Sequence, residues 1–256
     1  MHFCIGFFGF VRDYPIQEDV DKFLNLLPTN STVDIFISCP NVLDEYKNIN
    51  VMVNKEEFYR VFNNKIIDIN LYQYDPFKFI KKSREIGVID FTRHRYHPYR
   101  ILSLIYTIST ISSIIANHIE NTNVKYDNII ITRLDIIPTI SSFGLLLNKP
   151  NDDTLYCWRV ISNLNAEDRL QIGCYDAIKI LSQMYDNIII SPNDDEFYIE
   201  LLIGKYIQSH SILKKIQENV NFIGGHKWAY SPYGKYSDEF INYINNIIKL
   251  YDLQKF

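Results

Sequence analysis

The chain has 256 residues, of which 47% are hydrophobic and 22% are charged, and its formal net charge is −4. This apolar content is sufficient for one large domain with a sizeable core. A surface that binds the backbone of a nucleic acid needs an excess of basic residues, and the chain has no such excess. We therefore expect no nucleic-acid partner.

The cysteines and the apolar stretches together predict the cellular compartment of the protein. The chain has four scattered cysteines, Cys4, Cys39, Cys157 and Cys174. They form no C-x-x-C pair, which favours buried free thiols in a reducing compartment over disulfides or metal ligands. The apolar run at 2–11 is too short for a membrane span and lacks the features of a secretion signal, and the run at 101–116 is interrupted by serine and threonine. We therefore expect a cytoplasmic protein with no membrane span.

Continuous apolar runs bounded by turn residues predict strands, and apolar residues at helical spacing predict helices. In chain order, the predicted elements are a strand at 2–10, a helix at 17–27, strands at 33–39 and 66–71, a helix at 98–117, strands at 128–132 and 155–160, a helix at 166–185, a strand at 188–191, a helix at 196–209, a strand-like stretch at 220–223 and a helix at 237–250.

The alternation of strands with helices predicts an α/β fold with a mixed, mainly parallel central sheet flanked by helices. In such sheets, ligands bind at the carboxyl ends of the strands. No repeat and no break in composition divides the chain. We expect a single domain over residues 1–256, in which residues 237–256 form a C-terminal helix that packs on it.

The first motif is the run GFFGFVR at residues 6–12, where the first predicted strand ends. Gly9 lets the backbone approach a ligand closely, and the Arg12 guanidinium can bind two phosphate oxygens at once. The alternative is two structural glycines and an arginine on the surface. The run contains neither the G-x-G-x-x-G pattern of dinucleotide-binding folds nor the G-K-[ST] ending of a P-loop.

The second motif is the basic and aromatic run TRHRYHPYR at residues 92–100, where a helix is predicted to begin. A helix N-terminus presents unpaired N–H groups and a positive dipole end. Arg95 and Arg100 would complete a clamp for a pyrophosphate, and Tyr96 or Tyr99 could stack on a base. The alternative is a solvated basic loop.

The third motif is ITRLDIIP at residues 131–138, where an apolar strand ends in charged residues and is predicted to stop at Pro138. Asp135 at the carboxyl end of a strand is suited to hold a divalent cation that bridges two phosphates, and Arg133 could add positive charge beside a departing diphosphate. The alternative is an Arg–Asp ion pair that orders the turn.

Two further motifs carry candidate polar residues. Glu167 and Asp168 are adjacent carboxylates before an amphipathic segment, where Asp168 is either a helix cap or a general base for an acceptor hydroxyl. The run GGHKW at 224–228 follows the strand-like stretch. His226 could bind a metal or a phosphate and Lys227 could pair with a diphosphate, although a lone histidine is more often neither.

The order of these motifs resembles GT-A-type (Rossmann-like) glycosyltransferases. The resemblance rests on GFxR, the DIFIS strand, a long helix, YDNIIITRLD, DRLQIG and an acidic helix, and it spans roughly Phe3 to His226. Among these enzymes, the chain is most similar to sugar transferases of large DNA viruses and of bacterial surface-polysaccharide loci. In them an R-x-D element stands where D-x-D usually lies.

The resemblance implies roles for matching residues. Gly9 and Arg12 match a nucleotide contact, Asp135 and His226 match a site for Mn²⁺ or Mg²⁺, and Asp168 lies where an acceptor-side acid is common. It also implies a UDP- or GDP-sugar donor and a glycan acceptor. Arginine at position 133, where D-x-D has aspartate, departs from the strict motif. Two alternatives stay open, which are an inactive sugar-nucleotide-binding module and a nucleotidyltransferase.

Overall fold

The computed structural model describes residues 1–11, 14–42, 52–87, 98–134, 137–139, 155–157, 170–188, 199–211, 213–215, 221–223, 242, 245–246, 248–250 and 252. The strands are β1 (His2–Phe8), β2 (Thr32–Pro40), β3 (Ile66–Tyr72), β4 (Asn128–Arg133), β5 (Ile137–Thr139), β6 (Leu155–Cys157), β7 (Leu170–Gly173), β8 (Leu213–Lys215) and β9 (Asn221–Ile223). The helices are α1 (Gln17–Leu24), α2 (Lys55–Phe62), the 3₁₀ turn η1 (Asn63–Lys65), α3 (Pro76–Glu85), α4 (Pro98–Thr122), α6 (Tyr175–Ser182), α7 (Met184–Asn187) and α8 (Ile199–Ser209).

Seven of these strands form one sheet in the order β3-β2-β1-β4-β7-β6-β8. Strands β3, β2, β1 and β4 are parallel to one another, and β6 and β8 are parallel to each other. Strand β7 is antiparallel to β4 and to β6, the strands on either side of it. The predicted α/β class with a mixed, mainly parallel sheet is therefore confirmed.

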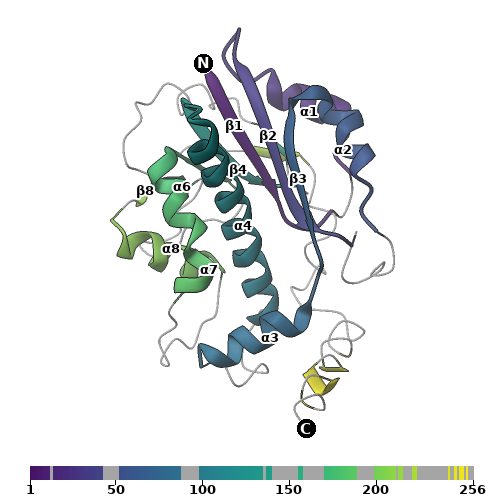
Figure 1. The fold of residues 1–256 in the computed structure, drawn as a ribbon, viewed down its shortest axis with the longest axis vertical. Coiled ribbons are helices and arrows are strands. Elements are labelled where there is room, and N and C mark those ends of the chain that lie inside the picture. The colour runs from purple at the N-terminus through teal and green to yellow at the C-terminus, as the bar shows by residue number, and fades with distance from the viewer. Residues whose placement is uncertain are drawn as a thin grey trace.

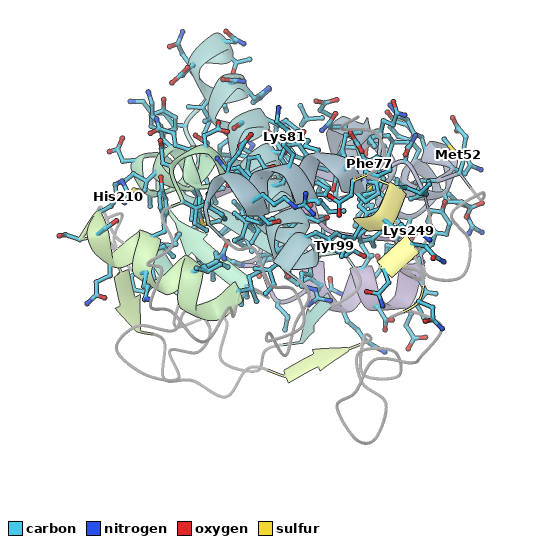
Figure 2. The ribbon with its side chains drawn as sticks, turned by 90° about the horizontal axis from the view of Figure 1, so that it is seen from below. Met52, Phe77, Lys81, Tyr99, His210 and Lys249 are labelled. Atoms are coloured by element: carbon cyan, nitrogen blue, oxygen red, sulfur yellow. The ribbon has the colours of Figure 1, made fainter. Side chains whose placement is uncertain are left out.

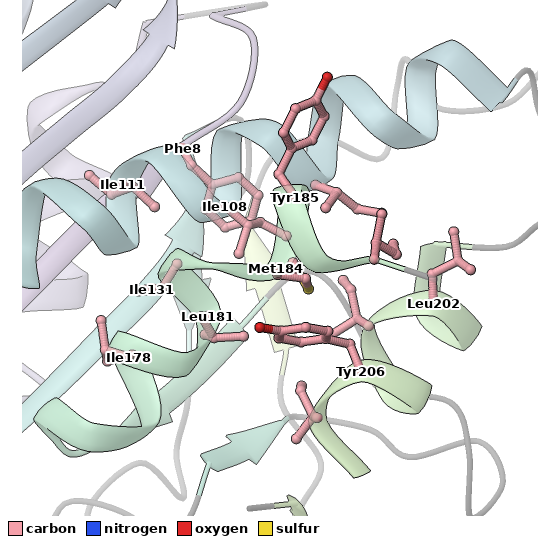
Figure 3. Close-up of a cluster of buried hydrophobic side chains, with 14 of the residues drawn as sticks. Phe8, Ile108, Ile111, Ile131, Ile178, Leu181, Met184, Tyr185, Leu202 and Tyr206 are labelled. Carbon is pink, nitrogen blue, oxygen red and sulfur yellow. The ribbon is translucent and has the colours of Figure 1, made fainter. Parts of the chain in front are cut away.

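Helices cover both faces of this sheet, as Figure 1 shows. On one face, α1 and α2 pack on the sheet through a core cluster that includes Phe23 and Phe58. On the other face, a second cluster joins α3, α4, α6, α7 and α8 to the sheet. Figure 3 shows side chains of α4, α6, α7 and α8 meeting Phe8 and Ile131 in this second cluster.

Strand β1 is apolar from Phe3 to Phe8 because both of its faces are covered. Phe3, Ile5 and Phe7 belong to the cluster on the α1 side, whereas Cys4 and Phe8 belong to the cluster on the α4 side. Side chains alternate between the two faces of a strand, so a strand buried on both faces shows no alternation of polar and apolar residues.

Helix α4 is the central helix of its face. Its segment Ile101–Thr122 is long and apolar enough to span a membrane by length and composition alone, but 61% of the window is buried inside the protein. Its hydroxyl groups connect it to other helices: Ser109 Oγ donates to the carbonyl of Leu181 at 3.2 Å and accepts the N–H of Tyr185 at 2.9 Å. The prediction of a core helix is confirmed.

Several predicted elements differ from the observed ones. The predicted helix at 166–185 contains β7 in its first half, and its helical part begins only at Tyr175. Ile188 follows α7 and is not in a strand, and residues 189–191 lie outside the described part. Helices α2 and α3 were not predicted. Each begins at a side-chain cap, Asn54 for α2 and Asp75 for α3, which accepts a backbone N–H two residues later.

The C-terminal segment contacts α3. Arg84 Nη1 donates to Asp252 Oδ1 at 2.6 Å. The residues described between 242 and 250 are helical. The arrangement of residues 1–256 as one domain with a C-terminal helix at 237–256 stays a prediction.

All four cysteines are free thiols, and Cys4, Cys39 and Cys157 are buried. Burial raises the pKa of the Cys39 thiol to about 12 and raises that of Cys4 as well. Thiols react as thiolates, so these two groups stay protonated and inert near neutral pH. The prediction of buried free thiols at Cys4 and Cys39 is confirmed.

A polar cluster ties three segments together at the amino ends of the strands. The Asp34 carboxylate accepts a hydrogen bond from Tyr126 Oη at 2.7 Å and lies 3.0 Å from His2 Nε2. The backbone N–H of His2 donates to Asp127 Oδ2 at 2.7 Å. The cluster therefore fixes the starts of β1 and β4 against β2. Burial raises the pKa of Tyr126, and its hydrogen bond to Asp34 raises it further.

Replacing Tyr126 with phenylalanine is expected to lower the free energy of unfolding by about 1–2 kcal/mol, because a hydrogen bond to a charged group is lost. A raised pKa keeps native Tyr126 protonated where the unfolded tyrosine ionises. Its contribution is therefore complete below about pH 10 and is lost as pH rises toward the native pKa. Urea denaturation between neutral pH and pH 11 measures this, and Tyr126→Phe should show the shallower alkaline decline.

The matched control is Tyr59→Phe, at a side chain that is 44% exposed. It should leave both the neutral stability and the alkaline slope unchanged. Equal alkaline slopes for the wild type and Tyr126→Phe would contradict the assignment.

Candidate functional site

The predicted ligand edge is the one at which β1 and β4 end side by side. Phe8 pairs with Arg133 in the parallel register, and the N–H of Leu134 donates to the carbonyl of Phe8 at 2.7 Å. Gly9 follows Phe8 and Asp135 follows Leu134 in the sequence. The first and third motifs therefore leave the sheet from neighbouring strands at one edge. Figure 2 views the molecule from this side.

The two glycines of the first motif differ in role. Gly6 lies within β1, where a Cβ atom would be 2.8 Å from Ile111 Cγ1 and 2.8 Å from Ile115 Cδ1, so it allows α4 to pack closely on the sheet. Gly9 has φ of +101°, and a Cβ built there would meet no described atom within 4 Å. Gly6 is thus the structural glycine of the alternative interpretation, whereas Gly9 adopts a glycine-favouring conformation with no described atom close to the position a side chain would take.

A row of aligned residues crosses the sheet at this edge. Asn70, Ser38, Phe8 and Arg133 are paired in register across β3, β2, β1 and β4. Paired residues point to the same face, and Phe8 belongs to the core on the α4 side. The Asn70 Nδ2 group donates to Ser38 Oγ at 3.2 Å. The α4 face of the sheet therefore becomes polar toward its carboxyl edge.

A second, two-stranded sheet pairs the end of the third motif with the strand that precedes the fifth motif in the sequence. Strand β5 pairs antiparallel with β9, and Ile137 lies opposite Ile223. Asp135 stands two residues before Ile137 in the sequence, and His226 stands three residues after Ile223. Pro138 is paired with Phe222 within β5. The expectation that Pro138 ends a strand is therefore wrong, because a proline is compatible with a strand at the edge of a sheet.

Strand β5 contacts β4 and α1, and α1 begins five residues after Arg12 in the sequence. The short second sheet therefore lies against a strand of the main sheet and against the helix that follows the first motif.

Because β7 is reversed, it begins at the same edge. Leu170 pairs with Thr132, so the chain enters β7 where it leaves β4. Asp168 stands two residues before Leu170. The fourth motif is therefore adjacent in sequence to a strand end at the predicted ligand edge.

Helix α4 begins in the second motif. Tyr99 is fully buried in the core on the α4 side, near the start of the helix in Figure 2, so its ring is a core residue and not a base-stacking platform. Arg100 lies in the first turn of α4. Arg95 and Tyr96 lie outside the described residues.

The structure thus brings together Gly9, Arg133 and the paired strands that flank the other motifs. The predicted site residues outside the described part of the chain are Arg12, Arg95, Tyr96, Asp135, Glu167, Asp168, His226 and Lys227. Within the described residues, no group of three or more histidine, cysteine, aspartate or glutamate side chains could hold a metal ion. Both proposed metal ligands, Asp135 and His226, belong to the part not described.

Sequence reasoning missed Ser38, Asn70 and Gln171. Ser38 and Gln171 are fully buried, and each interrupts an apolar strand near the ligand edge. Such an interruption was a usable signal, because a polar residue inside a buried strand needs a hydrogen-bond partner.

No protein-family model and no curated protein matches this chain. Solved structures similar to it include the glycosyltransferase GlyE of Streptococcus pneumoniae TIGR4, at 10% identity and a TM-score of 0.46 over 84% of this chain and 45% of that chain. Mouse xyloside xylosyltransferase 1 is similar at 8% identity and a TM-score of 0.40, over 84% of this chain and 85% of that chain. The bifunctional glycosyltransferase WbbM is similar at 8% identity and a TM-score of 0.45, over 84% of this chain and 38% of that chain.

The chain spans less than half of the length of GlyE and of WbbM. At these TM-scores, the likenesses do not assign the chain to a family. Its α/β class rests on its own strand order, and the function proposed for it rests on the geometry of the sheet edge.

Proposed function

We propose that the chain is a glycosyltransferase that moves a sugar from a nucleoside-diphosphate sugar, such as a UDP- or GDP-sugar, to a hydroxyl group of a glycan or other acceptor. One observation carries the proposal. The register of β1 with β4 makes the strands of the first and third motifs end at one sheet edge, and the pairing of β5 with β9 joins the end of the third motif to the strand that precedes the fifth. Ligands of open α/β sheets bind at this edge.

The residues at this edge suit a diphosphate. Gly9 offers a backbone that a ligand can approach, and Arg133 is a cationic side chain at the end of β4. In the proposal, Arg12, Arg95, Arg100 and Lys227 add positive charge for the phosphates, and Tyr96 stacks on the base. A local group of cations can bind one nucleotide in a chain whose net charge is −4.

A divalent cation, Mn²⁺ or Mg²⁺, belongs to the proposal through Asp135 and His226. Carboxylate oxygen and imidazole nitrogen are suitable ligands, and the Ile137–Ile223 pair supports their proximity because it joins the chain close to both residues. When bound, the cation supplies Lewis-acid stabilisation of the departing diphosphate.

On the acceptor side, Asp168 with its neighbour Glu167 is the proposed general base. A carboxylate near the acceptor hydroxyl can remove its proton as the new glycosidic bond forms, if the configuration is inverted. The entry of the chain into β7 beside Thr132 supports this role. The free thiols are consistent with action in the cytoplasm.

Sugar nucleotides are expected to raise the melting temperature of the protein, because a ligand that binds only the folded state stabilises it by mass action. A screen of UDP-, GDP- and CDP-sugars at about 100 times Kd should give about 2.7 kcal/mol of stabilisation for the correct donor. Nucleoside triphosphates and the free sugars serve as controls.

The products then separate three activities. Release of a nucleoside diphosphate with transfer or hydrolysis of the sugar supports the proposal. Binding without turnover in the presence of acceptors identifies an inactive binding module, and release of pyrophosphate from a nucleoside triphosphate identifies a nucleotidyltransferase. Either of the last two results would overturn the proposal.

A further inference from the structure

Gln171 is a polar residue in the apolar core near the ligand edge. It lies in β7, where it pairs with Ile131 of β4 on one side and with Cys157 of β6 on the other. Paired residues of neighbouring strands point to the same face, so its side chain lies on the α4 face with these two. Gln171, Ile131 and Cys157 are all 0% exposed.

The carboxamide of Gln171 is not satisfied by the described chain. Neither its Nε2 nor its Oε1 atom has a hydrogen-bond partner there. Asn70, the amide residue of the edge row, differs because it donates to Ser38 Oγ. A buried carboxamide without hydrogen-bond partners is unfavourable, and folded proteins pair nearly all such groups. Gln171 therefore lowers stability unless a bound group uses it.

Gln171 lies just inside the row that contains Arg133. Its partner Ile131 stands two residues before Arg133 on β4, which is about 7 Å along a strand. Diphosphate charge suits the edge beside Arg133, whereas the apolar surroundings of Gln171 suit an uncharged group. A carboxamide presents two donors and one acceptor, and a sugar hydroxyl both donates and accepts.

We propose that the Gln171 carboxamide binds a hydroxyl group of the transferred sugar and so contributes to the choice of donor. This inference rests on the proposed function, because it assumes that a sugar nucleotide occupies the edge. It assigns Gln171 to recognition of the sugar and not of the nucleoside or the phosphates.

The test compares Gln171→Met with the wild type. Methionine has a similar length and needs no hydrogen bond. Three quantities are measured on each 256-residue protein: the melting temperature without ligand, its increase with UDP or GDP alone, and its increase with the donor found in the screen. Gln183→Met, at an exposed glutamine after α6, is the matched control.

The unliganded Gln171→Met protein should be at least as stable as the wild type. It should respond normally to the nucleoside diphosphate but lose the additional stabilisation that the sugar gives. Its kcat/KM for the donor should fall on the order of tenfold, which is the size of one lost hydrogen bond.

Three results would overturn the inference. A lower melting temperature without ligand would mean that the amide is bonded within the protein. An unchanged response to the sugar would remove Gln171 from recognition, and an equal loss for the nucleoside diphosphate would mean that the effect is not specific to the sugar. A wild type that responds to no sugar nucleotide would contradict the proposed function itself.

Discussion

Replacing Asp135 with asparagine is expected to reduce sugar transfer by a factor on the order of 10²–10³, as removal of a charge-stabilising group in an active site does. Asparagine keeps the size of the side chain but lacks the charge that a hard divalent cation prefers. Arg133→Met should also reduce transfer, because it removes a cation beside the proposed diphosphate. Both rates are measured as release of nucleoside diphosphate at saturating donor, with Mn²⁺ or Mg²⁺ titrated.

The matched control is Asp186→Asn, at an exposed carboxylate of α7. It should transfer sugar at the wild-type rate. Thermal unfolding of each variant distinguishes a loss of catalytic activity from a loss of folded structure. Full transfer activity in a correctly folded Asp135→Asn protein would remove Asp135 from the site, and it would leave the proposed cation without its carboxylate.

Replacing Gly6 with valine is expected to have the largest effect on stability, about 3 kcal/mol or more, because overpacking a filled core forces side chains and backbone to move. Even a single Cβ atom would lie 2.8 Å from Ile111 Cγ1 and 2.8 Å from Ile115 Cδ1. The backbone of β1 and the axis of α4 would have to separate. Urea denaturation gives the free energy of unfolding for each variant.

A graded series makes this prediction sharper. Gly6→Ala should cost less than Gly6→Val, and adding Ile115→Val should recover part of the loss because it removes the Cδ1 atom. If Gly6→Ala were as stable as the wild type, the close contact between β1 and α4 would be wrong. Retained ligand-induced stabilisation in Gly6→Ala would agree with a structural role for Gly6.

The central strands could be predicted because each of them contains a continuous apolar run. The run III at residues 129–131 of β4 and the run FCIGFF at residues 3–8 of β1 are apolar throughout, as strands covered on both faces are. Helix α4 was predicted for the same reason, although the structure extends it to Thr122. These elements need no knowledge of a distant partner.

The pairing of short strands could not be predicted in this way. Strand β5 has three residues and includes Pro138, and only its distant partner β9 makes it a strand. The four residues of β7 are too few to distinguish a strand from a helical segment by periodicity, and tertiary pairing with β4 and β6 decides the outcome.

In the candidate site too, features that depend on local sequence could be predicted and features that depend on distant strands could not. The residues that follow β1 and β4 were predicted at one edge because parallel strands end together, and their register agrees with this expectation. Gln171 was missed because its burial depends on neighbours from two other strands. Helix α3 was missed although Asp75-Pro76 is a recognisable start, since proline is favoured in the first turn.

Because β7 runs in the reverse direction, the residues proposed to bind the two substrates can change separately in evolution. Strands β1 and β4 end at the ligand edge, whereas β7, which Asp168 precedes by two residues in the sequence, begins there. The two groups of residues therefore lie on separate connections. Connecting segments tolerate insertions and sequence change better than the strands they join. Under the proposed function, mutations before β7 can thus alter the choice of acceptor without changing the residues proposed to bind the donor.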